Sequence, residues 1–179
     1  MSLILAIDPG SVESGWCIID GLEPVAFGKT QNGDLLTMLA GCGDYARMLR
    51  DCDMHVIEMV ASYGMPVGAD VFETCVWIGR FERQIKIHCS ALGAPVDLVY
   101  RKDVKLHHCH SPRANDATIR QALVDRFAKG QPNHGKGTKA QPGWFYGFRA
   151  DVWQAYALAV YAADQLIDRE RRAAEPAQF

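Results

Sequence analysis

Two acidic side chains stand inside apolar stretches of this sequence, where an ionised carboxylate is costly. Asp8 ends the apolar run 3–7 and is followed at once by a Pro-Gly turn, and Glu58 lies within the apolar segment 54–60. An isolated ionised carboxylate in apolar surroundings is strongly disfavoured, so such an acid is neutral, paired or bound to a cation. Two such acids in one small core suggest a shared divalent cation, although Asp8 could instead only hydrogen-bond its own turn.

A third acid, Asp151, opens the alanine-rich helical pattern 151–169. A carboxylate in the first turn of a helix is favoured by the helix dipole alone, so Asp151 has a structural explanation as well as a functional one. The three carboxylates converge if the strands that carry Asp8 and Glu58 are neighbours and the last helix packs over the sheet. Converging carboxylates repel one another, and their hard oxygen atoms suit Mg²⁺ or Mn²⁺. A pair of such ions can activate water for phosphodiester cleavage.

The apolar patterns predict the elements that must position these acids. Short apolar runs bounded by turn residues indicate strands, and apolar residues at three-to-four spacing indicate helices. Asp34 is a plausible cap for the first helix, and Asn115 or Asp116 for the third. In chain order we expect strands at 3–7, 15–20 and 24–30, a helix at 34–50, a strand at 54–60, a helix at 71–92, a strand at 96–100, and helices at 115–127 and 151–169.

The charge is divided unevenly along the chain. At 179 residues the sequence is long enough for one domain, expected over 1–170, with 171–179 as a tail. Residues 101–149 hold 10 Lys and Arg against 3 Asp and Glu, and four of the six histidines. A basic block in an otherwise acidic chain is a candidate surface for the phosphates of nucleic acid, with a solvated loop as the alternative.

Composition also narrows the location. No stretch reaches the ~18 apolar residues of a membrane span, and the N-terminus lacks the pattern of a signal peptide. The six cysteines are scattered without a CxxC pair, which favours reduced, mostly buried thiols. We therefore expect no membrane association and a cytoplasmic protein, in the host cytoplasm if the gene belongs to a phage.

Two short motifs mimic binding sites. The tract HHCH at 107–110 cannot surround a metal ion by itself and no second ligand pair follows, so zinc binding is a minor alternative. The segment 130–137 begins like a phosphate-binding loop, but Gly137 stands where a Ser or Thr must reach Mg²⁺ and a helix precedes it, so we exclude an NTP site there. The glycine- and lysine-rich segment 130–143 is expected to be a flexible basic loop that folds over nucleic acid, or else a linker.

The order of elements and the positions of the acids resemble the ribonuclease H-like fold. More narrowly, the chain resembles the RuvC-like Holliday-junction resolvases, particularly their phage-type members. The segments that carry this resemblance are AIDPGSVESGW (6–16), VIEMVASYGMPVG (56–68), VFETCVWIGRF (71–81), RKDVK (101–105), NDATIRQAL (115–123) and DVWQAYALA (151–159). The resemblance implies an α/β fold with a central mixed five-stranded sheet flanked by helices. It also implies a Mg²⁺-dependent endonuclease that cleaves Holliday junctions and other branched DNA.

By position, Asp8, Glu58 and Asp151 match three metal-binding catalytic acids of that family. The sequence departs from the family pattern at a fourth acid, three residues after the one matched by Asp151, where this chain has Gln154. Because Gln154 offers only a neutral carbonyl oxygen, it would be a weak metal ligand or a substrate contact.

The resemblance further implies a homodimer that cuts symmetrically related strands of a four-way junction. The long helix 71–92 would form the dimer face, because Phe72, Val76 and Trp77 lie outside its main apolar stripe. Lys105 and Arg113 are the favoured phosphate contacts, because family DNA-contacting residues lie in the corresponding segment. The full set of candidate DNA contacts is Lys102, Lys105, Arg113, Arg120, Lys136 and Lys139.

Two other functions stay open at this point. Gln154 motivates a branched-DNA-binding dimer with weak or lost catalysis. The opening Asp-Pro-Gly followed by a second strand also resembles actin-like or sugar-kinase-like ATP-binding proteins, but those enzymes need two such domains and this chain is short. We therefore expect no nucleotide cofactor.

Overall fold

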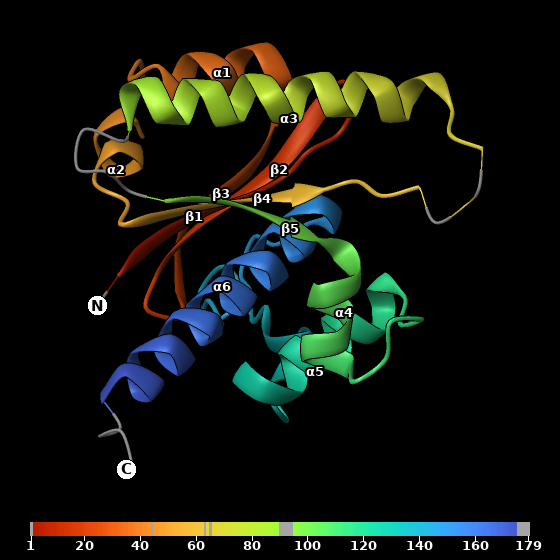
Figure 1. The fold of residues 1–179 in the computed structure, drawn as a ribbon. Coiled ribbons are helices and arrows are strands. Elements are labelled where there is room, and N and C mark those ends of the chain that lie inside the picture. Colours follow the sequence, from red (N-terminus) through yellow and green to blue (C-terminus); the bar gives the residue numbers. More distant parts are fainter. Residues whose placement is uncertain (1, 44, 63, 65, 90–94, 175–179) are drawn as a thin grey trace.

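The computed structural model describes residues 2–43, 45–62, 64, 66–89 and 95–174, and one five-stranded sheet organises them (Figure 1). The strand order is β3-β2-β1-β4-β5; β1 and β3 run antiparallel to β2, and β4 and β5 run parallel to β1. The strands are β1 (Leu3–Asp8), β2 (Glu13–Asp20), β3 (Glu23–Gln31), β4 (Met54–Met59) and β5 (Val96–Tyr100). The expected mixed five-stranded sheet is confirmed.

Helices cover both faces of this sheet. Figure 1 shows α1 and α3 above the strands, and α6 with α4 and α5 below them. The helices are α1 (Asn32–Leu39), α2 (Ala46–Arg50), α3 (Ala69–His88), α4 (Arg101–Cys109), α5 (Asp116–Phe127), the short 3₁₀ helix η2 (Pro132–Gly135) and α6 (Ala150–Ala174). No helix in the described part of the chain is both long enough and apolar enough to cross a membrane.

β1 lies at the centre of the sheet because it is apolar on both faces. Ile4 and Ala6 belong to the core on the α6 side, whereas Leu5 and Ile7 belong to the core on the α3 side. Successive side chains of a strand point to opposite faces, so the continuous apolar run serves both cores. By the same alternation, Asp8 points to the side that α6 covers.

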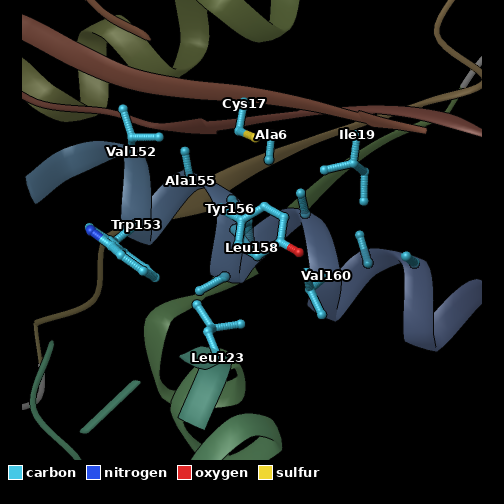
Figure 2. Close-up of a cluster of buried hydrophobic side chains, with 14 of the residues drawn as sticks. Ala6, Cys17, Ile19, Leu123, Val152, Trp153, Ala155, Tyr156, Leu158 and Val160 are labelled. Atoms are coloured by element: carbon cyan, nitrogen blue, oxygen red, sulfur yellow. The ribbon is translucent and has the colours of Figure 1, made fainter. Parts of the chain in front are cut away.

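α6 is the main support of the lower core, and its alanines allow it to lie close to the strands. Figure 2 shows Val152 and Ala155 directed toward the strands that carry Ala6 and Cys17, and Trp153 on another side of the helix. All five of these side chains are buried. The helix therefore packs directly on β1 and β2, which matters because it begins beside the predicted acids.

The prediction of a single helix over 34–50 is wrong, because two helices separated by a turn occupy that range. Gly41 and Gly43 have φ angles of 91° and 94°, a left-handed region that favours glycine and ends a helix. α1 also begins earlier than expected, so Asp34 lies in its first turn rather than at its cap. Asn115 does cap α5, accepting a hydrogen bond from the Thr118 N–H at 2.9 Å.

α4 was not expected from the sequence, and it contains most of the HHCH tract. His108 Nε2 lies 2.8 Å from the Ala157 carbonyl oxygen, and His107 Nε2 lies 2.7 Å from Asp164 Oδ2. Arg126 also donates two hydrogen bonds to Asp164. Burial lowers the pKa of His108 to about 4, so this ring is neutral at physiological pH. These contacts dock α4 and α5 against α6.

The segment 130–143 has more local structure than the expected flexible loop. It contains the 3₁₀ helix η2 and an isolated bridge between Gly137 and Pro142. Directly after it, Trp144 stacks on Phe127 with the ring centroids 5.3 Å apart and donates a hydrogen bond to the Tyr156 hydroxyl at 2.9 Å. These contacts attach the end of the segment to α5 and α6.

Candidate active site

Asp8 and Glu58 meet at the same end of two neighbouring parallel strands. Ile7 of β1 pairs with Ile57 of β4, so the two acids are the next residues on each strand. Both acids lie on the same face of the sheet as Ala6, because side chains two residues apart on a strand share a face. Their side chains therefore face α6. They line an open cavity of about 520 Å³. Its other lining residues are Arg101, Asp116, Ala117, Arg120, Ala150, Asp151, Trp153 and Gln154.

Asp151 reaches this cavity because β2 has no side chain at Gly15. Gly15 pairs with Asp8 on one side and with Lys29 on the other. A Cβ atom built on Gly15 would lie 2.6 Å from the Asp151 carbonyl oxygen and 3.0 Å from its Cβ. The first turn of α6 therefore rests directly on the backbone of β2, which brings Asp151 beside Asp8.

Gly15→Ala is accordingly expected to push the start of α6 away from the sheet. We expect the free energy of unfolding to fall by about 1–3 kcal/mol, as for other overpacked sites, measured by urea denaturation. Gly33→Ala is the matched control, since nothing lies within 4 Å of its Cβ position, and alanine in α1 should stabilise by about 0.5–1 kcal/mol. Equal denaturation midpoints for the two variants would contradict the close approach at Gly15.

A hydrogen-bonded triangle fixes the turn that follows Asp8. The Gly10 N–H donates to Ser14 Oγ at 3.3 Å, Ser14 Oγ donates to Asn32 Oδ1 at 2.6 Å, and Asn32 Nδ2 donates to the Gly10 carbonyl at 2.9 Å. Ser14 and Asn32 are buried. Sequence reasoning missed Asn32, which ties the turn to the start of α1.

Burial and neighbouring carboxylates raise the proton affinity of Asp8. Burial, then the negative charges of Glu58 and Asp151, raise the pKa of Asp8 from 3.8 to about 8, against an opposing effect of Arg101. Burial also raises the pKa of Glu58, although Arg101 opposes the shift. Asp8 is thus a partly buried carboxyl group with a raised pKa beside other acids, a pattern that is concentrated at functional sites.

Arg101 neutralises Glu58 and was not predicted as a site residue. Its Nη1 atom donates to both carboxylate oxygens of Glu58, at 2.9 and 3.1 Å, and its Nη2 donates to Asp116 Oδ1 at 2.6 Å. The signal in the sequence was weak: Arg101 follows β5 directly, and the preceding residue Tyr100 pairs with Met59 of β4. Only the register of β4 and β5 brings it to Glu58.

Lys29 neutralises Asp151 and was also missed. Its Nζ atom lies 2.8 Å from Asp151 Oδ2 and 3.1 Å from Glu13 Oε2. Hydrogen bonds to Asp151 and Glu13 raise the pKa of Lys29, so it is charged at neutral pH. In the sequence Lys29 is an ordinary charged residue of a predicted strand, and the structure places that strand, β3, at the edge of the sheet.

Arg120 lines the same cavity but serves a different purpose. Its guanidinium carbon lies 5.0 Å from the centroid of the Trp153 ring, and Trp153 packs against Phe145 and Phe148 at 4.5 and 5.1 Å. Among the described residues Arg120 has no acidic partner within ion-pair distance. A rigid aromatic platform thus holds a cation at the cavity wall with its N–H donors available to a ligand.

A basic cavity of about 450 Å³ adjoins the first one and shares Arg101 with it. Three of the predicted DNA contacts, Lys102, Lys105 and Arg113, line it together with Pro112. Lys136 and Lys139 lie elsewhere, on the segment 130–143. The structure thus gathers three of the six predicted contacts in the basic cavity and places Arg120 in the acidic one.

No family model matches this sequence, and no curated protein matches it either. Solved structures do. RuvC of Thermus thermophilus aligns with a TM-score of 0.60 and 14% identity over 93% of this chain and 96% of its own. The same protein in complex with a Holliday junction substrate aligns with a TM-score of 0.60 and 14% identity over 94% and 97%. The chain has the RuvC fold. The expected ribonuclease H-like architecture is therefore confirmed.

Within this RuvC fold, carboxylates from β1, β4 and α6 surround one cavity, and their chemistry fits a hard divalent ion. The oxygen donors of Asp8, Glu58 and Asp151 suit Mg²⁺ or Mn²⁺, and burial together with the neighbouring acids raises the pKa of Asp8, a shift that a bound cation would oppose. In the described part of the chain no three acidic, His or Cys side chains are grouped closely enough to hold a metal as they stand. Glu58 and Asp151 are each engaged by a basic side chain instead.

Gln154 lies in the same cavity, one helical turn after Asp151. It is buried, with 8% of its surface exposed. The same cavity holds four carboxylates, those of Asp8, Glu58, Asp151 and Asp116, and two guanidinium groups, those of Arg101 and Arg120. The catalytic and metal-binding roles of Asp8, Glu58, Asp151 and Gln154 stay predictions.

Proposed function

We propose that this protein is a structure-selective DNA endonuclease that cleaves Holliday junctions and other branched DNA, using divalent-metal-activated water. The observation that carries the proposal is the arrangement of Asp8, Glu58 and Asp151 around one open cavity, within a RuvC fold. RuvC of Thermus thermophilus has been solved with a Holliday junction substrate, which supports branched DNA as the substrate class.

The two adjoining cavities suggest a path for the DNA backbone. The acidic cavity would receive the phosphate that is cut, and the basic cavity lined by Lys102, Lys105 and Arg113 would receive a neighbouring phosphate. Arg101 lies in the wall that they share. Phosphate contacts of this kind supply much of the affinity for nucleic acid and little sequence specificity, which agrees with recognition of a branched shape.

Each side chain then has a distinct part in the reaction. A divalent ion held by Asp8, Glu58 and Asp151 would supply the activated water and stabilise the developing charge. Arg120 would bind a non-bridging oxygen of the phosphate from its Trp153 platform. Asp116 would keep Arg101 at the cavity wall when Glu58 releases Arg101 to bind the divalent ion.

Cleavage of a four-way junction at two symmetric sites calls for two copies of the chain, and we include a homodimer in the proposal. α3 offers an apolar outer surface, since Phe72 and Val76 are 62% and 53% exposed. Trp77 is partly buried there and carries the guanidinium of Arg80 over its ring at 4.6 Å. Burying these side chains in a symmetric interface would remove them from water.

The test is cleavage of end-labelled four-way junctions beside linear duplex, with Mg²⁺, Mn²⁺ and EDTA in parallel. We expect paired symmetric cuts in the junction with either metal, no cuts in EDTA, and little cleavage of the duplex. Junction binding in EDTA without cleavage in either metal would instead indicate a branched-DNA-binding protein. This is the second candidate, because Gln154 is neutral and two of the three acids are paired with basic side chains. Equal cutting of linear duplex would contradict structure selectivity.

A further inference from the structure

The acids Asp8 and Asp151 stand between two cavities. The first is the acidic cavity with Glu58 and Arg120. The second, about 340 Å³ in volume, is formed by the turn after β1, the start of β2 and Lys29. Asp8 and Asp151 line both of them, so a phosphate placed over these carboxylates has a different chemical environment on each side.

The pairing of β3 with β2 places Lys29 in the wall of the second cavity. Lys29 is the register partner of Gly15, which has no side chain, so the lysine reaches across β2 to Asp151 without obstruction. Its ammonium group bridges Asp151 and Glu13, at 2.8 and 3.1 Å. Two of the acids that line this cavity are therefore already paired with a cation that belongs to the protein.

Positive charge on both sides of the phosphate accelerates phosphodiester cleavage, because the attacking oxygen and the leaving oxygen both carry negative charge in the transition state. On the first side, Asp8 and Glu58 offer oxygen ligands for a divalent ion. On the second side Lys29 is already paired with Asp151 and Glu13, so that a further ion using these two acids would have to displace its ammonium group.

We propose that Lys29 supplies the positive charge on the second side of the phosphate, so that each chain binds one divalent ion and not two. This inference rests on the proposed nuclease function and names the charge that would complete its site. Lys29 would touch the leaving oxygen as a fixed charge, held in place by Asp151 and Glu13. A lysine serves here because an ammonium group is a compact point charge that a carboxylate pair can orient.

The first test counts ions in the unmodified protein. Titration calorimetry with Mn²⁺, without DNA, is expected to show one binding site per chain. Two sites per chain of similar affinity would overturn the inference, whether or not the protein cleaves junctions. Failure of the nuclease proposal is a separate result, namely no junction cleavage by the wild-type protein in Mg²⁺ or Mn²⁺.

The second test asks whether the Lys29 ammonium group assists cleavage or only competes with a metal ion for Asp151. Lys29→Met should bind Mn²⁺ about tenfold more tightly, since Asp151 loses its positive partner. Under single-turnover conditions with saturating Mn²⁺ and junction, it should cleave about 10²-fold more slowly, the loss typical of removing one transition-state donor. Tighter Mn²⁺ binding together with wild-type or faster cleavage would overturn the inference, because Lys29 would then only compete with the ion.

Two further variants control for folding and general charge. Lys29→Arg keeps the charge and should recover part of the cleavage rate, which a loss caused by misfolding would not do. Lys129→Met removes one exposed lysine beyond the end of α5, and should leave both Mn²⁺ affinity and cleavage rate near wild type. Equal slowing by Lys29→Met and Lys129→Met would also overturn the proposal.

Discussion

Asp8→Asn is expected to lower the rate of junction cleavage by at least about 10³-fold, the loss that follows when several kcal/mol of transition-state stabilisation are removed. Asp8 lines both cavities and lies next to Glu58 and Asp151. The amide keeps the shape of the side chain but loses the charge that would hold a divalent ion. Single-turnover cleavage of a labelled four-way junction in Mg²⁺ measures this rate.

The same substitution should make the protein more stable. The pKa of Asp8 is about 8 in the folded protein and 3.8 as the ordinary value. Between these values the unfolded chain ionises Asp8 while the folded protein still holds the proton, so stability falls as pH rises from about 4 to about 8. Asparagine has no proton to lose. Because one pKa unit is worth about 1.4 kcal/mol, Asp8→Asn should raise the free energy of unfolding by a few kcal/mol at pH 8 and hardly at all at pH 4.

Urea denaturation of wild type and Asp8→Asn at both pH values, without metal, measures this difference. Asp168→Asn is the control, because Asp168 is an exposed acid near the end of α6, and its effect should be small at both pH values. A variant that lost cleavage but was less stable than wild type at pH 8 would show that Asp8 has a structural role and that its charge is compensated.

The strands and their acids could be predicted because burial leaves a strong local signal. Continuous apolar runs mark β1 and β4, and an acid at the end of such a run is conspicuous in sequence alone. α4 was missed for the opposite reason. Its sequence RKDVKLHHC is polar, and only Val104 of the helix is buried, so its position depends on contacts of His107 and His108 with α6.

The cations of the site were missed because their roles depend on register rather than on local pattern. Lys29 meets Asp151 only because it pairs with Gly15 in β2, and Arg101 meets Glu58 only because β5 pairs with β4. Trp153 shows the same limit: it reads as one more apolar residue of α6, yet in the structure it supports Arg120 at the cavity wall. Acids were therefore visible to sequence reasoning, while their partners were not.

Arg101 and Lys29 together reduce the repulsion among the three carboxylates around the cavity. Each cation pairs with one of the other two acids, Glu58 or Asp151, whereas Asp8, with a pKa of about 8, is mostly protonated at neutral pH. At neutral pH the proton on Asp8 thus neutralises the one acid of the three that neither cation pairs with. A divalent ion that bound there would have to compete with this proton.

Binding of Mn²⁺ is expected to tighten by about 50-fold between pH 6 and pH 8, because a metal ligand must be deprotonated and Asp8 is ionised to about 1% and 50% at these pH values. The pKa of about 8 for Asp8 sets this window. Binding at pH 7 should release nearly one proton per ion. Calorimetry in two buffers of different ionisation enthalpy measures both the affinity and the protons released.

Asp8→Asn is again the informative comparison, since it should bind Mn²⁺ weakly and with little dependence on pH over this range. Equal wild-type affinities at pH 6 and pH 8, or no proton released, would mean that Asp8 is not a ligand of the ion. If the prediction holds, cleavage at low metal concentration should rise with pH over the same window and become independent of pH at saturating metal. That convergence distinguishes competition between proton and metal from a group that titrates in the chemical step, which would keep its effect at any metal concentration.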